Sequence, residues 1–292
     1  MSDDPFITHR NLLFTVAYEV LGSAADAEDV VQESWLRWAG LEEAARADVV
    51  NPRAYLVQTV TRQALNRLRT LARRREDYVG EWLPEPLLTM PDIADDVELA
   101  DSVSMAMLTV LETLTPTERA VFVLREVFDV PFDEIAQAVD KSAAAVRQIA
   151  HRSREHVAAR RPRIDVDRRE QQAVMDCFLA AIQNGDIQGL IDVMAPDVVL
   201  VSDGGGFKKA ALRPIYGADK VLRWLAGVTA GVGELVGVPM SINGAPGVRF
   251  ELDGELDTVV TAEFVGGKVT RIFAVRNPHK LERLDEPTVL RR

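Results

Sequence analysis

The chain has 292 residues, of which 34 are Lys or Arg and 45 are Asp or Glu, so its formal net charge is −11. A content of 47% hydrophobic and 27% charged residues excludes a disordered or collagen-like chain. The single cysteine excludes an internal disulfide framework and a cysteine-based zinc site. No stretch is apolar over the roughly 20 residues that a membrane-spanning helix needs, and the start MSDDPFITHR lacks the apolar run of a secretory signal. We expect a cytoplasmic protein of two or three domains without a membrane partner, and the acidity taken alone argues against nucleic acid.

The acidic excess is concentrated in one short segment. Residues 76–101 contain nine Asp or Glu and no Lys or Arg, which accounts for most of the net charge of −11. Its prolines and the lack of a helical period before about Ile93 predict a linker. Arginines cluster on both sides of it. The composition therefore divides the chain into units 1–75, 76–101, 102–163 and 164–292.

The first unit has the apolar spacing of helices. Two helices are predicted over residues 6–40, separated by Gly22-Ser23, because apolar residues recur at helical spacing on both sides of that break. A third begins at Pro52, which suits a first helical turn, and its apolar stripe leaves Arg62 and Arg69 on other faces. This pattern alone fits a solvated basic helix end as well as a nucleic-acid surface.

The unit 102–163 predicts a helix-turn-helix. One helix is expected from Pro116 to Phe128, followed by a shorter one over PFDEIAQAV, a turn at Asp140-Lys141, and a last helix capped by Ser142. Val146 and Ala150 face inward on that last helix, which leaves Arg and Gln side chains outside. Such side chains recognise guanine and adenine edges in a major groove. A plain helical hairpin is the alternative.

These motifs resemble regions 2 and 4 of the extracytoplasmic-function sigma factors, in the family's order and spacing. The segments are DAEDVVQESWLRW at 26–38, NPRAYLVQTVTRQALNRLR at 51–69, and LTPTERAVFVLREVFDVPFDEIAQAVDKSAAAVRQIAHRSRE. The resemblance implies core RNA polymerase and promoter DNA as partners. Arg62 and Asn66 stand where many members have Asn and Asp, and Asp140 replaces the usual turn glycine. These departures leave the promoter sequence open.

The resemblance also assigns site residues. The polymerase-binding residues are Asp26, Asp29, Gln32, Glu33 and Arg37. The DNA-binding residues are Arg62, Asn66, Arg67, Arg69 and Arg73 for the minus-ten element, and Ser142, Arg147, Gln148, His151, Arg152 and Arg154 for the minus-thirty-five element. Promoter melting would capture unstacked bases on the protein surface, and the acidic linker would restrain binding to DNA without polymerase.

The last unit, 164–292, predicts a different fold. Amphipathic helices over 170–183, 186–194 and 219–228 are followed by strands at Val198 and from about Leu235, with turns at Asn243-Gly244, Asp253-Gly254 and Gly266-Gly267. Helices followed by an antiparallel sheet indicate an α+β cone with a cavity. The whole chain is thus expected to be multi-domain, with two all-α sigma domains before this cone.

This unit resembles the SnoaL-like domain of the nuclear-transport-factor-like superfamily, which one sigma subgroup carries as a regulator in cis. Three short motifs carry the resemblance, and their residues are Trp82, Pro84 and Pro86 in the linker, Asp203, Gly204, Gly205 and Gly206 after the first strand, and Asn277, Pro278 and Lys280 near the end. Phe207 displaces the usual Lys after the glycines, and His279 replaces the common Asp. The resemblance implies intramolecular contacts from these loops to the sigma domains or the linker.

The sequence shows no catalytic constellation or metal-ligand spacing, so we expect no enzyme, cofactor or metal site. Cys177 is expected in the core because apolar helix positions flank it. Two alternatives stay open. In one, the last domain binds or turns over a small hydrophobic metabolite; in the other, the chain is a ligand-responsive DNA-binding regulator that acts without polymerase. The promoter, the inducing signal, any anti-sigma factor and the oligomeric state are not determined by these patterns.

Overall fold

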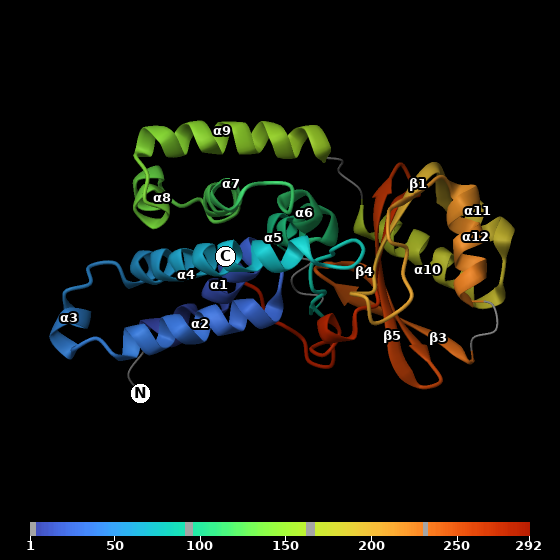
Figure 1. Ribbon diagram of the computed structural model, residues 1–292, viewed down its shortest axis with the longest axis horizontal. Coiled ribbons are helices and arrows are strands. Elements are labelled where there is room, and N and C mark those ends of the chain that lie inside the picture. Colours follow the sequence, from blue (N-terminus) through green and yellow to red (C-terminus); the bar gives the residue numbers. More distant parts are fainter. Residues whose placement is uncertain (1–3, 91–95, 162–166, 230–232) are drawn as a thin grey trace.

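The computed structural model describes residues 4–90, 96–161, 167–229 and 233–292, without the side chains of 72–76. A helical half is followed by a half built on one curved sheet (Figure 1). The predicted fold class, two all-α units before an α+β domain, is confirmed.

Of the first four helices, α1, α2 and α4 pack on one another, and the short α3 lies beyond one end of them (Figure 1). Their bounds are α1 Pro5–Leu21, α2 Ala24–Ala39, α3 Glu43–Ala47 and α4 Pro52–Glu76. Gly22 ends α1 in a left-handed conformation with φ 69°, and the Ser23 side chain caps α2. The break therefore lies at the predicted position, Gly22-Ser23.

The next helices include the helix-turn-helix. Their bounds are α5 Val97–Val103, α6 Met105–Leu111, α7 Pro116–Phe122, α8 Phe132–Val139 and α9 Ala143–Arg160. The helix predicted from Pro116 to Phe128 is continuous to Val127, but its second half, Val123–Val127, is π-helical, and the consecutive Val123 and Leu124 are both buried there. Asp140 adopts the left-handed conformation expected of the turn, with φ 54°.

The two helical modules share one hydrophobic core. Buried residues from α1, α2 and α4 are continuous with those from α5 to α9, and α4 packs against both α7 and α8. The predicted linker passes beside this core rather than over the surface, because Leu83 through Leu87 are all buried. The acidic segment therefore includes a buried carboxyl, Glu85, which is 4% exposed.

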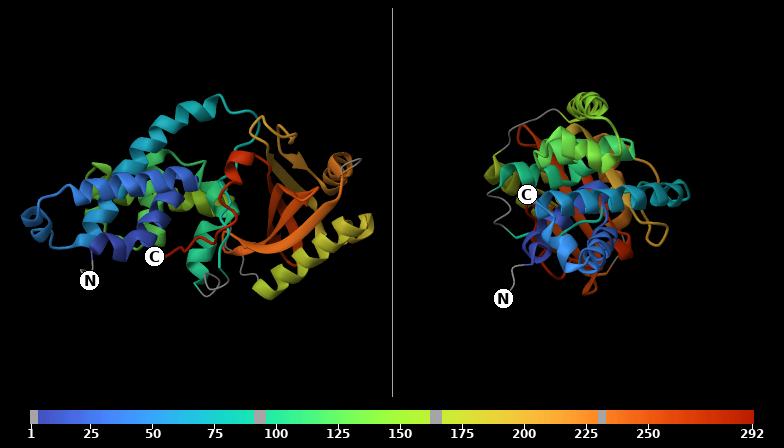
Figure 2. Two further views of the ribbon diagram at one scale, coloured as in Figure 1. Left: turned by 90° about the horizontal axis from the view of Figure 1, so that it is seen from below. Right: turned by 90° about the vertical axis from the view of Figure 1, so that its left-hand side faces the viewer.

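The last part is a six-stranded sheet with three helices against one face (Figure 2). The helices are α10 Arg168–Asn184, α11 Ile187–Val193 and α12 Ala218–Thr229. The strands are β1 Met194–Asp203, β2 Ile215–Tyr216, β3 Leu235–Ile242, β4 Ala245–Leu252, β5 Glu255–Val265 and β6 Lys268–Val275, in the order β2-β1-β6-β5-β4-β3. β1 runs parallel to β6, and the other neighbours are antiparallel.

Two details of this domain differ from the sequence expectation. The two-residue strand β2 was not predicted, because it is too short to show alternation. The expectation that Cys177 lies in the core is wrong: its side chain is exposed. The buried face of α10 is formed by Met175, Phe178 and Leu179, which flank Cys177 in sequence but lie on another side of the helix.

The two faces of the sheet have different partners. One face and the three helices enclose the core of the domain, with Phe178 and Phe250 among its buried side chains. The other face packs on the helical half and the linker, where Phe273 and Val275 join Leu83 and Met105 in a separate buried cluster. The chain then returns to the helical half, where the Arg291 amide donates to Thr15 of α1 at 3.0 Å and Arg292 pairs with Asp96, the cap of α5, at 2.8 Å. There Leu290 is buried in the helical core.

Candidate nucleic-acid interface and interdomain junction

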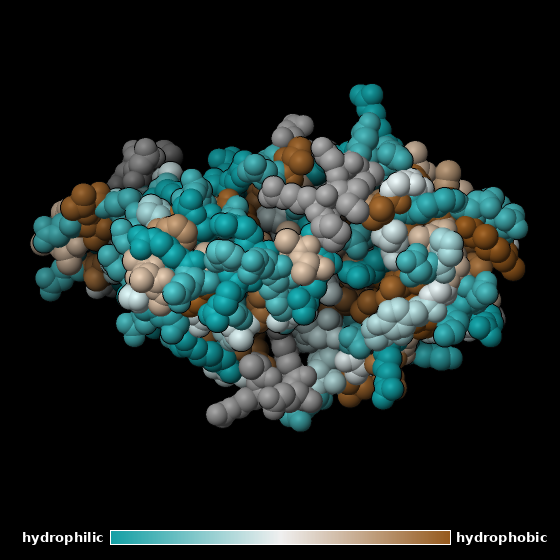
Figure 3. Space-filling view, turned by 90° about the horizontal axis from the view of Figure 1, so that it is seen from above, coloured by the Kyte–Doolittle hydropathy of each residue, from teal (hydrophilic) through white to brown (hydrophobic). Residues whose placement is uncertain are grey.

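Helix α9 lies on the outside of the molecule (Figure 1). Ser142 caps it by accepting a hydrogen bond from the Ala145 amide, and Val146 and Ala150 anchor it to the core. The face outside this anchor is exposed and contains Arg147, Gln148, His151, Arg152 and Arg154. The view onto α9 shows a largely hydrophilic surface (Figure 3).

Side chains within the same module orient several of these groups. The Arg147 guanidinium lies over the Phe132 ring at 5.6 Å from its centroid. Arg154 forms a bidentate ion pair with Glu126, at 2.7 and 3.1 Å, which raises the pKa of Arg154. His151 Nδ1 lies 3.4 Å from the Glu155 carboxylate. The helix therefore presents partly pre-oriented cations on a face able to enter a major groove.

The predicted minus-ten face of α4 is bonded to other parts of the same chain. Arg62 donates to the Gln137 carbonyl of α8 at 2.7 Å. Arg67 pairs with Asp26 and Asp29 of α2 at 2.7 and 2.9 Å, which raises the pKa of Arg67. These bonds join α4 to the helix-turn-helix on one side and to α2 on the other.

Two other predicted residues of α4 are bonded within the helix itself. Asn66 accepts from Arg69 at 3.3 Å, and both side chains are exposed. The side chain of Arg73 lies outside the described residues.

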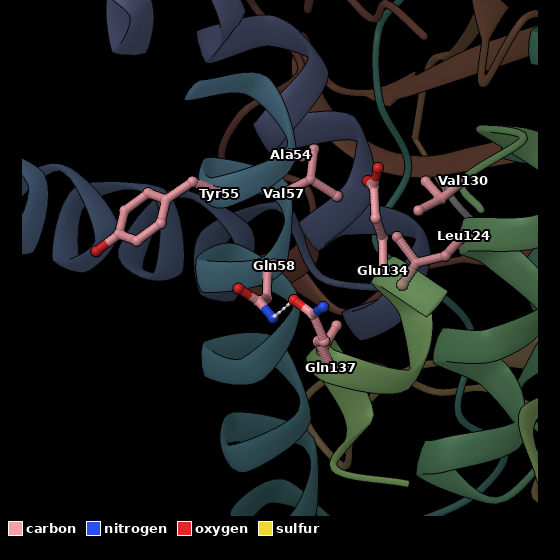
Figure 4. A pocket seen from close by; sticks show the side chains of 9 residues that line it. Ala54, Tyr55, Val57, Gln58, Leu124, Val130, Glu134 and Gln137 are labelled. Atoms are coloured by element: carbon pink, nitrogen blue, oxygen red, sulfur yellow. Dashed lines mark hydrogen bonds between the residues drawn. The ribbon is translucent and has the colours of Figure 1, made fainter. Parts of the chain in front are cut away.

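A cleft separates α4 from α8 beside these contacts (Figure 4). Its volume is about 200 Å³, and Val57, Leu124 and Val130 supply apolar lining. Gln58 donates to Gln137 across it at 3.4 Å. The contact between the two helical modules is therefore partly hollow at this edge.

The exposed face of α2 is a second candidate surface. Asp29, Gln32, Glu33 and Arg37 are exposed there, and Asp26 is half-buried beside Arg67. Trp35 and Leu36, which the sequence expectation omitted, are 42% and 57% exposed. Both lie between the predicted binding residues Glu33 and Arg37 in sequence, but the sequence pattern did not show that their apolar side chains are exposed.

Asp203 is the centre of an interdomain junction. It ends β1 and is completely buried. The Tyr78 hydroxyl donates to its Oδ1 at 2.5 Å, the Leu83 amide to its Oδ2 at 2.9 Å, and the Lys280 ammonium to its Oδ2 at 2.7 Å. The Gly205 amide also donates to Oδ1, at 3.0 Å. The three motifs of the family resemblance are thus brought together at one buried carboxylate.

Aromatic residues of the linker cover the Lys280 ammonium. This group lies 3.2 Å from the Trp82 ring centroid and donates to the Leu83 carbonyl at 2.5 Å. Asn277 donates to the Tyr78 hydroxyl at 2.8 Å. Burial and the neighbouring Asp203 carboxylate raise the pKa of the Tyr78 phenol. The buried ion pair therefore has partners on both sides.

The glycines of this loop are required by close approach. A Cβ on Gly204 would lie 2.2 Å from the Lys208 carbonyl oxygen. On Gly205, whose φ is 60°, it would lie 2.3 Å from the Asn277 amide nitrogen. The third glycine, Gly206, has φ 79°. The motif is thus a packed turn.

Glu85 joins the linker to the start of α2. Pro84 and Pro86 are buried on either side of it. Its carboxylate accepts from the Ala24 amide at 2.8 Å and from the Ser23 hydroxyl at 3.2 Å. Burial raises the pKa of Glu85, and these hydrogen bonds oppose that effect. The sequence expectation missed Tyr78, which lies before the linker motif, and also Leu83 and Glu85, which lie inside it, because only Trp82, Pro84 and Pro86 were named from that motif.

The two departures from the family pattern touch one another. The rings of Phe207 and His279 meet edge to face with centroids 4.7 Å apart. Lys208 pairs instead with Asp257 at 3.3 Å, and Arg276 pairs with the same carboxylate at 2.8 Å. Although burial opposes it, hydrogen bonds from Thr258 and the charge of Arg276 hold the pKa of Asp257 below its usual value.

Among the described residues, no group of three or more His, Cys, Asp or Glu is placed to hold a metal ion. No helix within the described ranges is both long and apolar enough to span a bilayer.

Comparison with known proteins agrees with this arrangement. Residues 6–74 match the family model of sigma-70 region 2, and residues 104–157 match that of sigma-70 region 4. The chain is 36% identical over 310 residues to the ECF RNA polymerase sigma factor SigJ of Mycobacterium tuberculosis, covering 99% of this chain and 97% of the relative. It is 32% identical over 284 residues to the probable ECF sigma factor SigI of the same species, covering 94% of this chain and 93% of the relative.

The crystal structure of Mycobacterium tuberculosis SigJ superposes with a TM-score of 0.75 at 33% identity, over 96% of this chain and 98% of that one. The two regions and the helix-turn-helix define a sigma-70-type transcription factor. The chain belongs to the extracytoplasmic-function RNA polymerase sigma factors.

Proposed function

We propose that the chain binds core RNA polymerase through α2 and directs it to promoters whose two elements are contacted by α4 and α9. Its C-terminal domain would modulate this activity in cis by holding the sigma modules together. Acting with polymerase places the protein in the cytoplasm.

One observation carries the proposal. Arg62, which the family resemblance assigns to the minus-ten element, is bonded to α8, the helix directly before α9. Promoter elements at minus ten and minus thirty-five lie about 25 base pairs apart, or about 85 Å at 3.4 Å per pair. The 18-residue helix α9 is only about 27 Å long. The two modules must therefore separate before both elements can be bound.

The buried junction supports a holding role for the C-terminal domain. Asp203 and Lys280 belong to that domain, whereas Tyr78, Trp82 and Leu83 belong to the segment that connects the two sigma modules. Docking of this segment limits how far the modules can move apart. Polymerase, or a signal acting on the C-terminal domain, would then favour the state in which the linker is released from Asp203 and Lys280.

A cleavable cross-link tests this proposal. Gln58→Cys and Gln137→Cys place thiols on the two sides of the cleft, in a Cys177→Ser background because Cys177 is exposed. A short bismaleimide with a disulfide in its spacer should abolish run-off transcription by polymerase, and reduction should restore it. Each single-cysteine chain treated in the same way is the control. Full transcription by the cross-linked chain would overturn the proposal.

We propose further that the C-terminal domain acts by contact rather than by catalysis. Its acids Asp203 and Asp257 are both engaged in buried or half-buried ion pairs, and large side chains such as Phe178, Phe250 and Phe264 occupy the space between sheet and helices. Native mass spectrometry of the purified full chain provides the test. A stoichiometric small molecule that co-purifies with the chain would favour a ligand-binding domain instead.

A further inference from the structure

The turn between β3 and β4 is inserted into the helical half. Asn243 and Gly244 have φ of 52° and 71°, the left-handed pair typical of a tight hairpin. The next hairpin turn of the same sheet, Asp253-Gly254, has the same backbone, with φ of 53° and 84°. Asn243 is completely buried, whereas Asp253 and Gly254 are exposed. The two turns are therefore alike locally and differ in their surroundings.

The Asn243 side chain is fully hydrogen-bonded in this position. Its Nδ2 donates to the Tyr18 hydroxyl at 2.7 Å and to the Val103 carbonyl at 2.8 Å. Its Oδ1 accepts from the Leu87 amide at 2.9 Å, and its own amide donates back to the Leu87 carbonyl at 2.9 Å. Asparagine suits both the left-handed backbone and this set of two donors and one acceptor.

The partners of this turn come from three parts of the chain. Tyr18 lies on α1, within the part that matches region 2, and its hydroxyl donates to the Glu85 carbonyl at 2.6 Å. Leu87 belongs to the linker, and Val103 ends α5, just before the part that matches region 4. One side chain of the C-terminal domain thus bonds to both sides of the division between the sigma modules.

The neighbouring glycine fits the same place. A Cβ on Gly244 would lie 2.9 Å from the Ala100 Cβ and 3.0 Å from its Cα, so α5 approaches the turn directly. The Gly244 amide donates to the Thr89 hydroxyl at 3.0 Å. Around Gly254, in contrast, no atom lies within 4 Å of such a Cβ.

We propose that the Asn243-Gly244 turn is a second restraint through which the C-terminal domain holds the sigma modules together, separate from the junction at Asp203. This inference rests on the proposed function, since it assigns part of the same regulation to a different site. Separation of α1 from α5 removes one of the two Nδ2 partners, so the turn favours the joined arrangement over the separated one.

Matched glycine substitutions test the proposal. Gly244→Ala and Gly254→Ala impose the same backbone strain on equivalent turns, and only the first meets the helical half. Fluorescent labels at the exposed Ala39→Cys and Ala158→Cys, in the Cys177→Ser background, report separation of α2 from α9 in the full chain. We expect Gly244→Ala to increase the separated fraction at least tenfold and Gly254→Ala to leave it unchanged. Equal effects of the two substitutions would overturn the inference.

A second pair of substitutions keeps the test decisive if Gly244→Ala does not fold. Asn243→Asp introduces the residue that occupies the equivalent position of the other turn and removes both Nδ2 donors. Asp253→Asn is the reverse substitution, made in the exposed turn. Asn243→Asp should separate the modules and Asp253→Asn should not; the same energy transfer in both would contradict the proposal. If added polymerase fails to change energy transfer in the unsubstituted labelled chain, the proposed function itself fails, whichever result the variants give.

Discussion

The predicted DNA-binding faces of α4 and α9 have similar chemistry and different surroundings. On α9, Arg147 contacts Phe132 and Arg154 contacts Glu126, both within the same module, and the face is exposed. On α4, Arg62 and Arg67 are bonded to the other module and to α2. The sequence of a basic helical face therefore predicts which chemical groups it carries, but not whether other parts of the same chain bond to them. In the free chain, the predicted promoter surface on α9 is exposed, whereas two arginines of the one predicted on α4 are bonded to other parts of the chain.

The largest expected effect comes from breaking the Asp203–Lys280 ion pair of the interdomain junction, which we propose keeps α4 against the second module. Lys280→Met leaves the carboxylate of Asp203 buried without its ion-pair partner, and such a loss costs about 3–5 kcal/mol of unfolding free energy. Because the junction holds the linker, this variant should also expose α4. Denaturant unfolding measures the first effect, and protection of α4 amides from hydrogen exchange measures the second.

Lys208→Met is the matched control for this variant. It removes a lysine from a neighbouring ion pair whose lysine is 44% exposed, and Arg276 stays with Asp257. The expected loss is below about 1 kcal/mol. Equal losses for the two variants would mean that burial of the Asp203 pair does not determine its contribution.

The second expected effect is that the free energy of unfolding depends on pH through Glu19, whose side chain lies between the two sigma modules. Glu19 of α1 is completely buried; burial raises its pKa to about 8, while Ser102 and Arg119 oppose the shift. A raised pKa in the folded state means that the stabilisation is complete below pH about 4.5 and is lost as the pH rises through about 8. The expected loss is about 1.4 kcal/mol per pH unit, or about 4 kcal/mol from pH 5 to 8.

Glu19→Gln should remove this slope, because the amide does not titrate. Unfolding free energies of both chains, measured at several pH values, give the comparison. Parallel pH profiles would exclude Glu19 as the source.

Much of this arrangement follows from the sequence, and the part that does not has a physical reason. The helix breaks at Gly22 and Asp140 follow from local backbone preferences, and so do the left-handed hairpin turns. The motif residues of the junction were named through a family resemblance. Local patterns could not show that Glu85 caps α2 or that Asn243 reaches Tyr18, because those bonds join residues 61 and 225 positions apart.

The sequence did not predict that Cys177 is exposed, for a related reason. Apolar neighbours in sequence do not lie on one side of a helix, and the side that faces the sheet is decided by tertiary packing.

The exposed face of α9 allows base contacts to be distinguished from phosphate contacts. Arg147→Ala should reduce discrimination at one base pair of the minus-thirty-five element by about 1–3 kcal/mol, because a bidentate contact to guanine is lost. Arg152→Ala should weaken binding to all sequences alike and reduce the salt slope by about 1. Competition binding of the holoenzyme to single-base variants at several salt concentrations separates the two. A uniform loss for Arg147→Ala would assign it to phosphate.

The smallest effect concerns Arg62, which the proposal gives two opposed roles. Its bond to Gln137 favours the joined modules, and in the separated state it would contact the minus-ten element. An exposed bond of this kind contributes about 1 kcal/mol or less, so Arg62→Ala should modestly increase module separation in the free chain while weakening promoter opening by the holoenzyme. Arg69→Ala is the control, because Arg69 is exposed on the same helix and bonded to Asn66. It should weaken promoter opening without changing module separation. Equal energy transfer in the two variants would show that the bond of Arg62 does not hold the modules together. Packing alone would then keep α4 against the second module.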